Sequence, residues 1–345
     1  MNELILEQDI SNFVTRCSYW EHFRGKRFVI TGSTGLIGSI LVRCLIALEK
    51  QNGLGITIYC VCRDKEKAGK LFDLRLPYIF AITMSDFAKL ESSPVEGHVH
   101  YIIHAAAPTS SLYFATMPVE TYEGVVGLTK FVLERAMDLK AKGIVYLSSL
   151  EEYGEILDDK EKITEDVQGY INPLSARSSY SMGKRMAENL CYAFYSEHDT
   201  PVKIARLAQT FGAGVALEDK RVFAYIAKSA MKGEDVVLST LGDSKKNYCY
   251  TIDAVDAILR ILLFGNSGEA YNVANEQTYI SVRDMAELIL KTFSPKNQVL
   301  VGKGDASCYP PATKVRMSTE KLQKIGWLPM YDLKYMYKRL IDWYR

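Results

Sequence analysis

The sequence predicts an α/β protein built on a doubly wound parallel sheet, with a smaller C-terminal lobe. Short apolar runs alternate with helical patterns, a glycine-rich turn directly follows one of these runs, and the alternation breaks after residue 209. Repeated strand and helix units of this kind form parallel sheets with right-handed crossovers. The runs IVYLS and YIIHAAA are continuous rather than alternating, which is typical of strands buried on both faces.

Composition excludes several classes of protein. With 48% hydrophobic and 24% charged residues, the 345-residue chain is neither disordered, collagen-like nor a coiled coil. Its 42 Lys and Arg against 41 Asp and Glu give a net charge of +1, so we expect no nucleic-acid partner. No apolar run approaches the roughly 20 residues that span a bilayer, so we also expect no membrane partner.

The cysteines and the first residues bear on the compartment. Seven cysteines are odd in number and lack metal-ligand spacing, which favours reduced thiols and no metal site. The acidic segment 1–9 has no basic region followed by an apolar run, so it does not resemble a secretory signal. We therefore expect a cytoplasmic protein.

The elements are expected in a regular order. Apolar residues at helical intervals predict an amphipathic helical extension before the sheet, within residues 3–24. Buried strands follow at residues 27–31, 56–61, 99–104 and 144–148. Helices are expected from residue 36, from about residue 64 and near residues 120–139.

These elements divide the chain into three parts. Residues 1–24 are the extension, and residues 25–209 are expected to form the main domain, which the glycine turn described next marks as dinucleotide-binding. Residues 210–345 have shorter segments and more loops, and we expect them to form mainly a substrate-binding lobe. Within them, residues 247–270 are expected to return to the main domain.

The turn TGSTGLIG carries the first functional signal. Gly32, Gly35 and Gly38 lie three apart, directly after a strand and at the head of a helix. A Rossmann-type site needs glycines here for a tight turn, close approach to a pyrophosphate and close helix packing. The predicted cofactor contacts in this turn are Gly32, Thr34, Gly35, Leu36, Ile37 and Gly38.

The end of the second strand bears on the choice of dinucleotide. Dinucleotide enzymes place an acidic residue there on the ribose hydroxyls, whereas an arginine accepts a 2′-phosphate. The chain has Arg63 followed by Asp64. Asp64 facing the ribose predicts NAD, and Arg63 facing it predicts NADP; a solvated charge pair opening a helix is the third alternative.

Tyr180 and Lys184 form a candidate catalytic pair. Four residues apart on a helix, they lie on one face one turn apart. A phenol titrates near ~10, and an adjacent ammonium is expected to lower that pKa toward the working range. Ser149 ends the strand IVYLSS, at the sheet edge where functional groups gather, and can hydrogen-bond the reacting oxygen.

These residues resemble the extended short-chain dehydrogenases/reductases, in the NAD-dependent epimerase/dehydratase family that acts on nucleotide sugars. The resemblance covers residues 25 to about 330 and includes, besides the glycine turn, HAAAP at 104–108, SSLEEYG at 148–154, NPLSARSSYSMGKRMAE at 172–188 and YTIDAVDA at 250–257. Within the family, the motifs are most similar to those of UDP-glucuronate decarboxylases.

The resemblance implies a transient oxidation of the sugar C4 hydroxyl by a bound nicotinamide cofactor. Tyr180 would take the hydroxyl proton, Lys184 would hold the nicotinamide ribose, and Ser149 would orient the hydroxyl. Glu151 is a candidate base or substrate contact. Further cofactor contacts implied by HAAAP are Ala105, Ala106 and Ala107.

Several reactions stay open at this point. Decarboxylation of a UDP-uronate leads, and 4-epimerisation and NADP-dependent 4-keto reduction are alternatives. A 4,6-dehydratase is disfavoured, because its family motif has an acid where this chain has Leu150. A non-catalytic dinucleotide sensor is disfavoured too, since a sensor needs no phenol base.

The expected partners are a nucleotide sugar, taken to be UDP-linked, and a second copy of the chain. Candidate substrate contacts, besides Ser149, are Pro108, Ser110, Arg177, Arg221 and Lys246. Lys246 stands where relatives carry an arginine for the diphosphate, and a lysine offers only a point charge. The homodimer face would use Val125, Val132, Met186, Leu190 and Phe194, although core packing explains these residues equally well.

Overall fold

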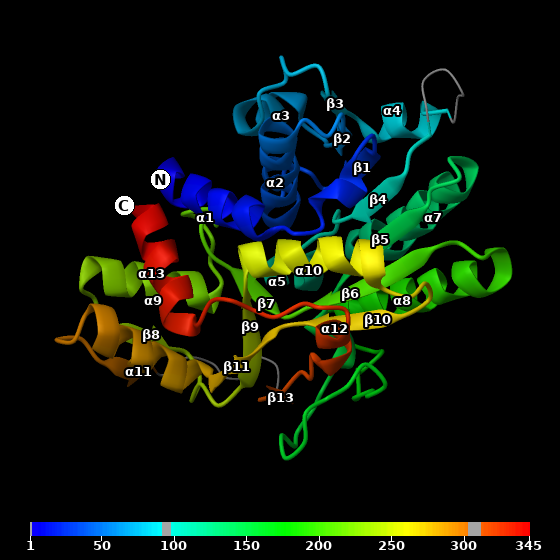
Figure 1. The fold of residues 1–345 in the computed structure, drawn as a ribbon. Coiled ribbons are helices and arrows are strands. Elements are labelled where there is room, and N and C mark those ends of the chain that lie inside the picture. Colours follow the sequence, from blue (N-terminus) through cyan, green and yellow to red (C-terminus); the bar gives the residue numbers. More distant parts are fainter. Residues whose placement is uncertain (1, 92–97, 303–311) are drawn as a thin grey trace.

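A computed structural model describes residues 2–91, 98–302 and 312–345 (Figure 1). Seven strands form one parallel sheet in the order β10-β6-β5-β4-β1-β2-β3. Their bounds are β1 Arg27–Thr31, β2 Thr57–Val61, β3 Ile79–Ile82, β4 Tyr101–His104, β5 Gly143–Ser149, β6 Val202–Leu207 and β10 Ala270–Val273. The predicted doubly wound α/β fold is confirmed.

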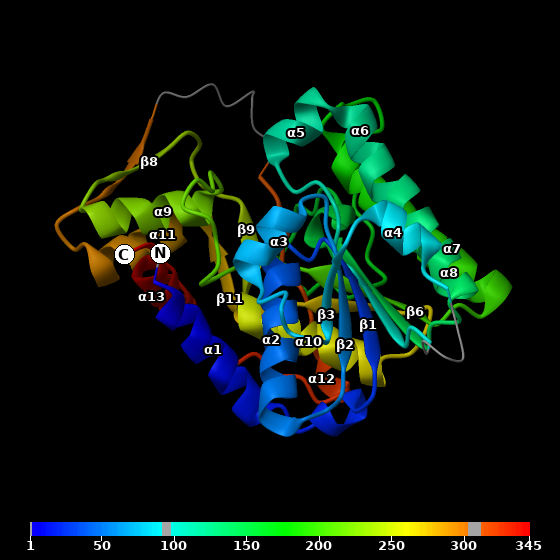
Figure 2. The same ribbon diagram turned by 90° about the horizontal axis from the view of Figure 1, so that it is seen from above.

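Helices cover both faces of this sheet, because successive residues of a strand point to opposite sides. Phe28 and Ile30 of β1 join one buried cluster with α2 (Leu36–Asn52) and α10 (Thr251–Phe264). Val29, between them, joins a second cluster with α7 (Leu128–Asp138) and α8 (Ser178–His198). Figure 2 shows the strands between α2 on one side and α7 and α8 on the other.

The remaining helices of this domain are short, apart from the two on the second face. They are α3 Lys65–Leu71, α4 Met84–Lys89, α5 Ser111–Thr116, α6 Pro118–Tyr122, α7 Leu128–Asp138 and α8 Ser178–His198. A π-helical turn at Glu123–Gly127 joins α6 to α7. The helix expected near 120–139 is therefore interrupted, because one wide turn shifts its register.

A second, smaller sheet lies in the C-terminal lobe. In it β9 (Lys245–Tyr250) pairs with β7, β11 and β13. The other lobe elements are β7 Gln209–Phe211, β8 Val236–Leu238, β11 Asn275–Ser281, β12 Val299–Val301, β13 Lys314–Val315, α9 Val222–Lys232, α11 Val282–Phe293, α12 Glu320–Lys324 and α13 Leu333–Tyr344. Directly after β9 the chain crosses back to the main sheet, where α10 packs against β5 and β6 and β10 pairs with β6, before it returns to the lobe at β11.

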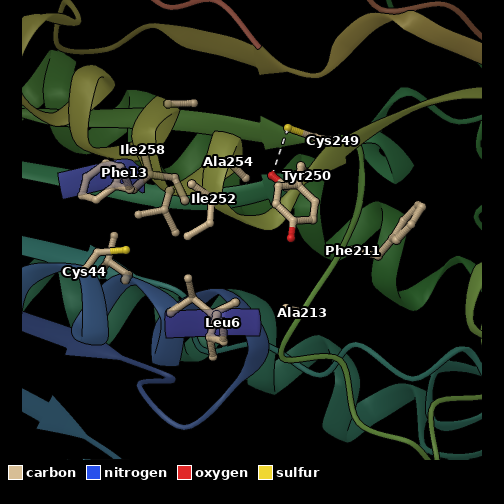
Figure 3. Close-up of a cluster of buried hydrophobic side chains, with 14 of the residues drawn as sticks. Leu6, Phe13, Cys44, Phe211, Ala213, Cys249, Tyr250, Ile252, Ala254 and Ile258 are labelled. Carbon is tan, nitrogen blue, oxygen red and sulfur yellow. Dashed lines mark hydrogen bonds between the residues drawn. The ribbon is translucent and has the colours of Figure 1, made fainter. Parts of the chain in front are cut away.

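The N-terminal segment fastens the domain to the lobe. Helix α1 (Glu3–Arg16) packs against α2, α10 and α13, and its Leu6 and Phe13 lie in the buried cluster drawn in Figure 3. Asp9, fully buried, accepts a hydrogen bond from the Tyr250 hydroxyl and pairs with Arg339 at 2.7 Å. Both chain ends therefore contribute to one core.

Burial decides which of the proposed dimer residues can face a partner. Val125 and Val132 are 1% exposed inside the cluster of the second sheet face, so core packing, the other alternative, accounts for them. Leu190 and Phe194 are partly buried against the same cluster. Met186 is 47% exposed and is the member of the set that a partner could cover.

The cysteines of the described residues are free and buried, and Cys308 lies outside those residues. They are Cys17, Cys44, Cys60, Cys62, Cys191 and Cys249. Within residues 2–91, 98–302 and 312–345, no helix combines the length and apolar character that crossing a membrane requires.

Candidate active site

The glycine turn after β1 leaves room for backbone alone. Gly32 has a φ of +66°, and a Cβ there would lie 2.7 Å from Ala105 O and from Ala106 N. A Cβ on Gly38 would lie 2.3 Å from Gly32 O. Both positions therefore require glycine, the first for its backbone conformation and both for space.

The same turn presents the open end of a helix. Gly35 precedes α2 in an extended conformation and provides no side-chain cap, so N–H groups of the first turn are available to a ligand. Thr34 is partly exposed, and Leu36 and Ile37 pack partly against the core. This cradle fits the pyrophosphate of a dinucleotide, which a helix N-terminus attracts.

Two residues that the sequence analysis did not single out hold the turn in place. Ser33 Oγ donates to Val61 O at 3.1 Å, joining the turn to β2. Thr31 Oγ1 lies 2.7 Å from His104 Nδ1 and accepts a hydrogen bond from Ala106 N at 3.3 Å. Ala105, Ala106 and the following Ala107 are thereby fixed beside the glycine turn, at the end of β4. Strand-end hydroxyls before a glycine turn are the signal that could have indicated this.

Asp64, which follows β2, uses its carboxylate to cap the next helix. Its Oδ1 accepts hydrogen bonds from Glu66 N at 2.9 Å and Lys67 N at 3.0 Å, which caps α3. Arg63, next to it, is exposed. Asp64 therefore caps a helix through one carboxylate oxygen, and Asp64 and Arg63 both stay candidate contacts of the dinucleotide ribose.

Tyr180 and Lys184 lie one turn apart on α8 and are 8% and 2% exposed. The phenol ring stacks on Phe114 of α5, with ring centroids 4.1 Å apart and planes 6° apart. Lys184 Nζ donates to Leu147 O at 2.7 Å and lies 5.6 Å from the centroid of the Tyr180 ring. Phe114 had no distinctive sequence signal, because stacking across 66 residues depends on the fold.

The electrostatics of the phenol differ from the expectation. Burial raises the pKa of Tyr180, the Glu151 carboxylate raises it further, and a hydrogen bond with Ser149 and the charge of Arg221 lower it. Burial also lowers the pKa of Lys184 to about 7. The expected lowering of the phenol pKa by Lys184 is therefore wrong for the chain alone, because desolvation dominates both groups.

The structure brings most of the proposed polar residues toward the phenol. Glu151 pairs with Lys246 at 3.9 Å, which links the end of β5 to the lobe strand β9. Arg221 precedes α9 and pairs with Asp219 at 2.5 Å, so its charge is partly neutralised. The site is thus lined by the main domain and by the C-terminal lobe.

The other proposed substrate contacts lie on loops beside these elements. Arg177 is exposed just before α8, and Ser110 is exposed just before α5. Pro108 packs against Gly124, where an added Cβ would lie 3.3 Å from the proline ring. None of these three shows a contact to Tyr180 or Lys184 in the described part of the chain.

Residues 28–274 match the model of the NAD dependent epimerase/dehydratase family. The chain belongs to this family. Membership confirms the resemblance read from the motifs, the assignment as an NAD-dependent enzyme, and NAD as the cofactor.

Two of the curated relatives of this chain are UDP-glucuronic acid decarboxylases. The chain is 29% identical to UDP-glucuronic acid decarboxylase 3 of Arabidopsis thaliana, over 89% of this chain and 86% of that protein. It is 27% identical to UDP-glucuronic acid decarboxylase 1 of Xenopus tropicalis, over 93% of this chain and 72% of that protein.

Solved structures of low identity share the fold. UDP-glucose 4-epimerase of Thermotoga maritima superposes with a TM-score of 0.77 at 19% identity, covering 92% of this chain and 98% of that chain. UDP-glucuronic acid 4-epimerase of Bacillus cereus, in complex with UDP-glucuronic acid and NAD, gives 0.74 at 18% identity, with coverages of 92% and 98%.

Proposed function

We propose that this protein oxidises the C4 hydroxyl of a UDP-linked uronic acid and releases the sugar carboxyl group as carbon dioxide. The observation that carries the proposal is the convergence of Ser149, Tyr180 and Lys184 where β5 meets α8. The names of the curated relatives support the choice of substrate.

Each residue of the site has a distinct task in this reaction. Bound NAD would supply the hydride acceptor and donor for C4. Tyr180 Oη would take the proton of the C4 hydroxyl while Ser149 orients that hydroxyl. Because burial raises the pKa of the phenol, its ionised form depends on stabilisation by the Ser149 hydroxyl and the positive charge of Arg221.

The carbon dioxide step needs little from the protein. A 4-keto sugar with a carboxylate on C5 is a β-keto acid; when its C5–C6 bond breaks, the electron pair passes to the C4 carbonyl oxygen. A proton from water then replaces the carboxyl carbon at C5, and C4 is reduced again. Leu150 cannot donate a proton, which argues against the elimination of water that a 4,6-dehydratase performs.

Positive side chains from the main domain and from the C-terminal lobe would hold the substrate. Lys246 on β9 and Arg221 before α9 are placed to attract the diphosphate, and exposed Arg177 adds a third charge near α8. Lys246 is already paired with Glu151, so substrate binding would exchange one ion pair for another. A substrate anion therefore competes with Glu151 for the ammonium.

Assembly and compartment are part of the proposal. We expect a homodimer through the outer face of α8, where Met186 is exposed, and a cytoplasmic location that keeps the six buried cysteines of the described residues reduced. Light scattering at micromolar concentration tests the first expectation, and a monomer would contradict it.

The activity test follows product mass. The protein is incubated with NAD and one nucleotide sugar at a time: UDP-glucuronate, UDP-glucose or dTDP-glucose. Loss of carbon dioxide from UDP-glucuronate supports the proposal. An unchanged mass with altered retention would indicate epimerisation, loss of water would indicate dehydration, and gain of two hydrogens with NADPH would indicate reduction. NAD binding without turnover of any sugar would favour a sensor.

A further inference from the structure

Helix α8 carries a third buried polar side chain, one turn after Lys184. Tyr180, Lys184 and Glu188 follow each other at intervals of four residues, so they form one stripe along the helix. Glu188 is 6% exposed and has no task in the proposed chemistry. Because a buried carboxylate is costly unless it is paired and hydrogen-bonded, its partners indicate what it does.

The stripe faces the end of β5 residue by residue. The carbonyl of Leu147 accepts a hydrogen bond from Lys184 Nζ at 2.7 Å. Ser148, 4% exposed, donates its hydroxyl hydrogen to the Glu188 carboxylate. The next residue of the strand is the serine that hydrogen-bonds the catalytic phenol. Three consecutive strand residues therefore each contact a different member of the stripe.

Arg206 on β6 fixes the other side of the carboxylate. Its Nε lies 2.9 Å and its Nη2 lies 2.7 Å from Glu188 Oε2, and the arginine is 6% exposed. Its Nη1 donates to the Tyr153 hydroxyl at 3.1 Å and to Glu165 O at 2.6 Å. Glu188 is thus held in one position by two strands of the sheet.

The surroundings of Lys184 leave it short of negative charge. From β4 comes His104, which is neutral because burial lowers its pKa to about 3. From β5 comes the ring of Tyr146, whose centroid is 4.7 Å from Nζ. On α8, burial raises the pKa of Cys191, so that thiol is uncharged too. Glu188 supplies a carboxylate charge that opposes the desolvation of the ammonium.

We propose that Glu188 is a positioning residue of the reaction centre: its charge favours the ammonium form of Lys184, and its bond to Ser148 fixes the strand end that carries the catalytic serine. The inference rests on the proposed role of that centre, and it adds a residue that acts through the centre without touching the reacting atoms.

The charge is tested without any sugar. Protein labelled with 13C at the lysine ε-carbons is titrated by NMR, and the Lys184 signal is assigned by its loss in Lys184→Arg. Glu188→Gln keeps the shape and the ability to accept from Ser148 but removes the charge, so the pKa of Lys184 should fall by about one unit or more. Glu188→Asp should restore most of the loss. Glu197→Gln, an exposed glutamate on the same helix, is the matched control.

An unchanged Lys184 pKa in Glu188→Gln would overturn the charge role. Glu188→Gln leaves Arg206 paired with the buried Glu152 carboxylate at 3.0 Å. If the variant nevertheless does not fold, the double variant Glu188→Gln/Arg206→Gln removes both charges and should show a smaller fall of the same sign. No fall in the double variant would equally overturn the role. Because no substrate is involved, these results stand whether or not UDP-glucuronate is turned over.

The geometric role is tested by Ser148→Ala, which keeps every charge. The Lys184 pKa should stay unchanged, while kcat falls about tenfold at constant KM, as expected for the loss of one buried hydrogen bond. Ser148→Thr, which retains a hydroxyl, should recover the rate. Full activity of Ser148→Ala would overturn this half of the inference, whereas an inactive wild-type protein would instead contradict the proposed function.

Discussion

Gly38 offers the sharpest test of the cofactor cradle. In Gly38→Ala the new Cβ would lie 2.3 Å from Gly32 O and 3.0 Å from Ser33 Cα, whereas ordinary contacts begin near 3.4 Å. The turn must therefore move by about 1 Å, and overpacking of this kind costs about 1–3 kcal/mol. If that shift misplaces the N–H groups that face the pyrophosphate, the Kd for NAD should rise about 5- to 150-fold.

The assay is a calorimetric titration with NAD, together with a thermal melt. Gly127→Ala is the matched control, because no atom lies within 4 Å of the added Cβ and the backbone there is helical. That variant should bind NAD normally and unfold at the same or a slightly higher temperature. A Gly38→Ala protein that melts normally and binds NAD with unchanged Kd would refute the assignment of this turn to the cofactor.

Three further predictions concern single side chains. Tyr180→Phe should lower kcat by about 10²- to 10⁴-fold and leave the Kd for NAD unchanged, since it removes the proton acceptor alone; retained turnover in a steady-state assay removes Tyr180 from the mechanism. Burial lowers the pKa of Lys184 to about 7. Below pH 7 the folded and unfolded states both carry the proton, and the buried charge destabilises the fold. Above pH 7 the folded state loses the proton before the unfolded state does, so the contribution of Lys184 to stability rises with pH. Lys184→Met should therefore raise Tm by about 2 °C or more at pH 6 and by less at pH 8.5; a gain that grows with pH in a series of melts would contradict this. Lys246→Gln should raise KM for the nucleotide sugar about tenfold at constant kcat, whereas the exposed Lys160→Gln should change neither, and equal effects of the two would exclude a specific diphosphate contact.

Local patterns predicted four of the seven strands of the main sheet, β1, β2, β4 and β5, because neighbouring residues set these apolar runs; β3, β6 and β10 were not predicted. Strand β1 and the start of α2 fall where the apolar run and the glycine turn indicated. The wide turn at Glu123–Gly127 was not visible, since the apolar spacing around it still suits a single helix. The position of β9 in the lobe sheet depends on pairing with β7 and β11, which no local pattern specifies.

The site could be predicted as a set of residue types but not as an electrostatic environment. The motifs named Ser149, Tyr180 and Lys184 by their order and spacing. The direction of the phenol pKa depends on how deeply the ring is buried, and the sequence does not report that depth. Ser148 and Glu188 lie 40 residues apart, so their hydrogen bond appears only once α8 is packed on β5.

The account as a whole is tested most directly by UDP-glucuronate labelled with 13C at its carboxyl carbon. The protein, incubated with NAD and this sugar, should release the label as carbon dioxide and leave an unlabelled UDP-pentose, and Tyr180→Phe should release none. Label that remains entirely in a UDP-hexuronate, whether epimerised or unchanged, would contradict decarboxylation by this site.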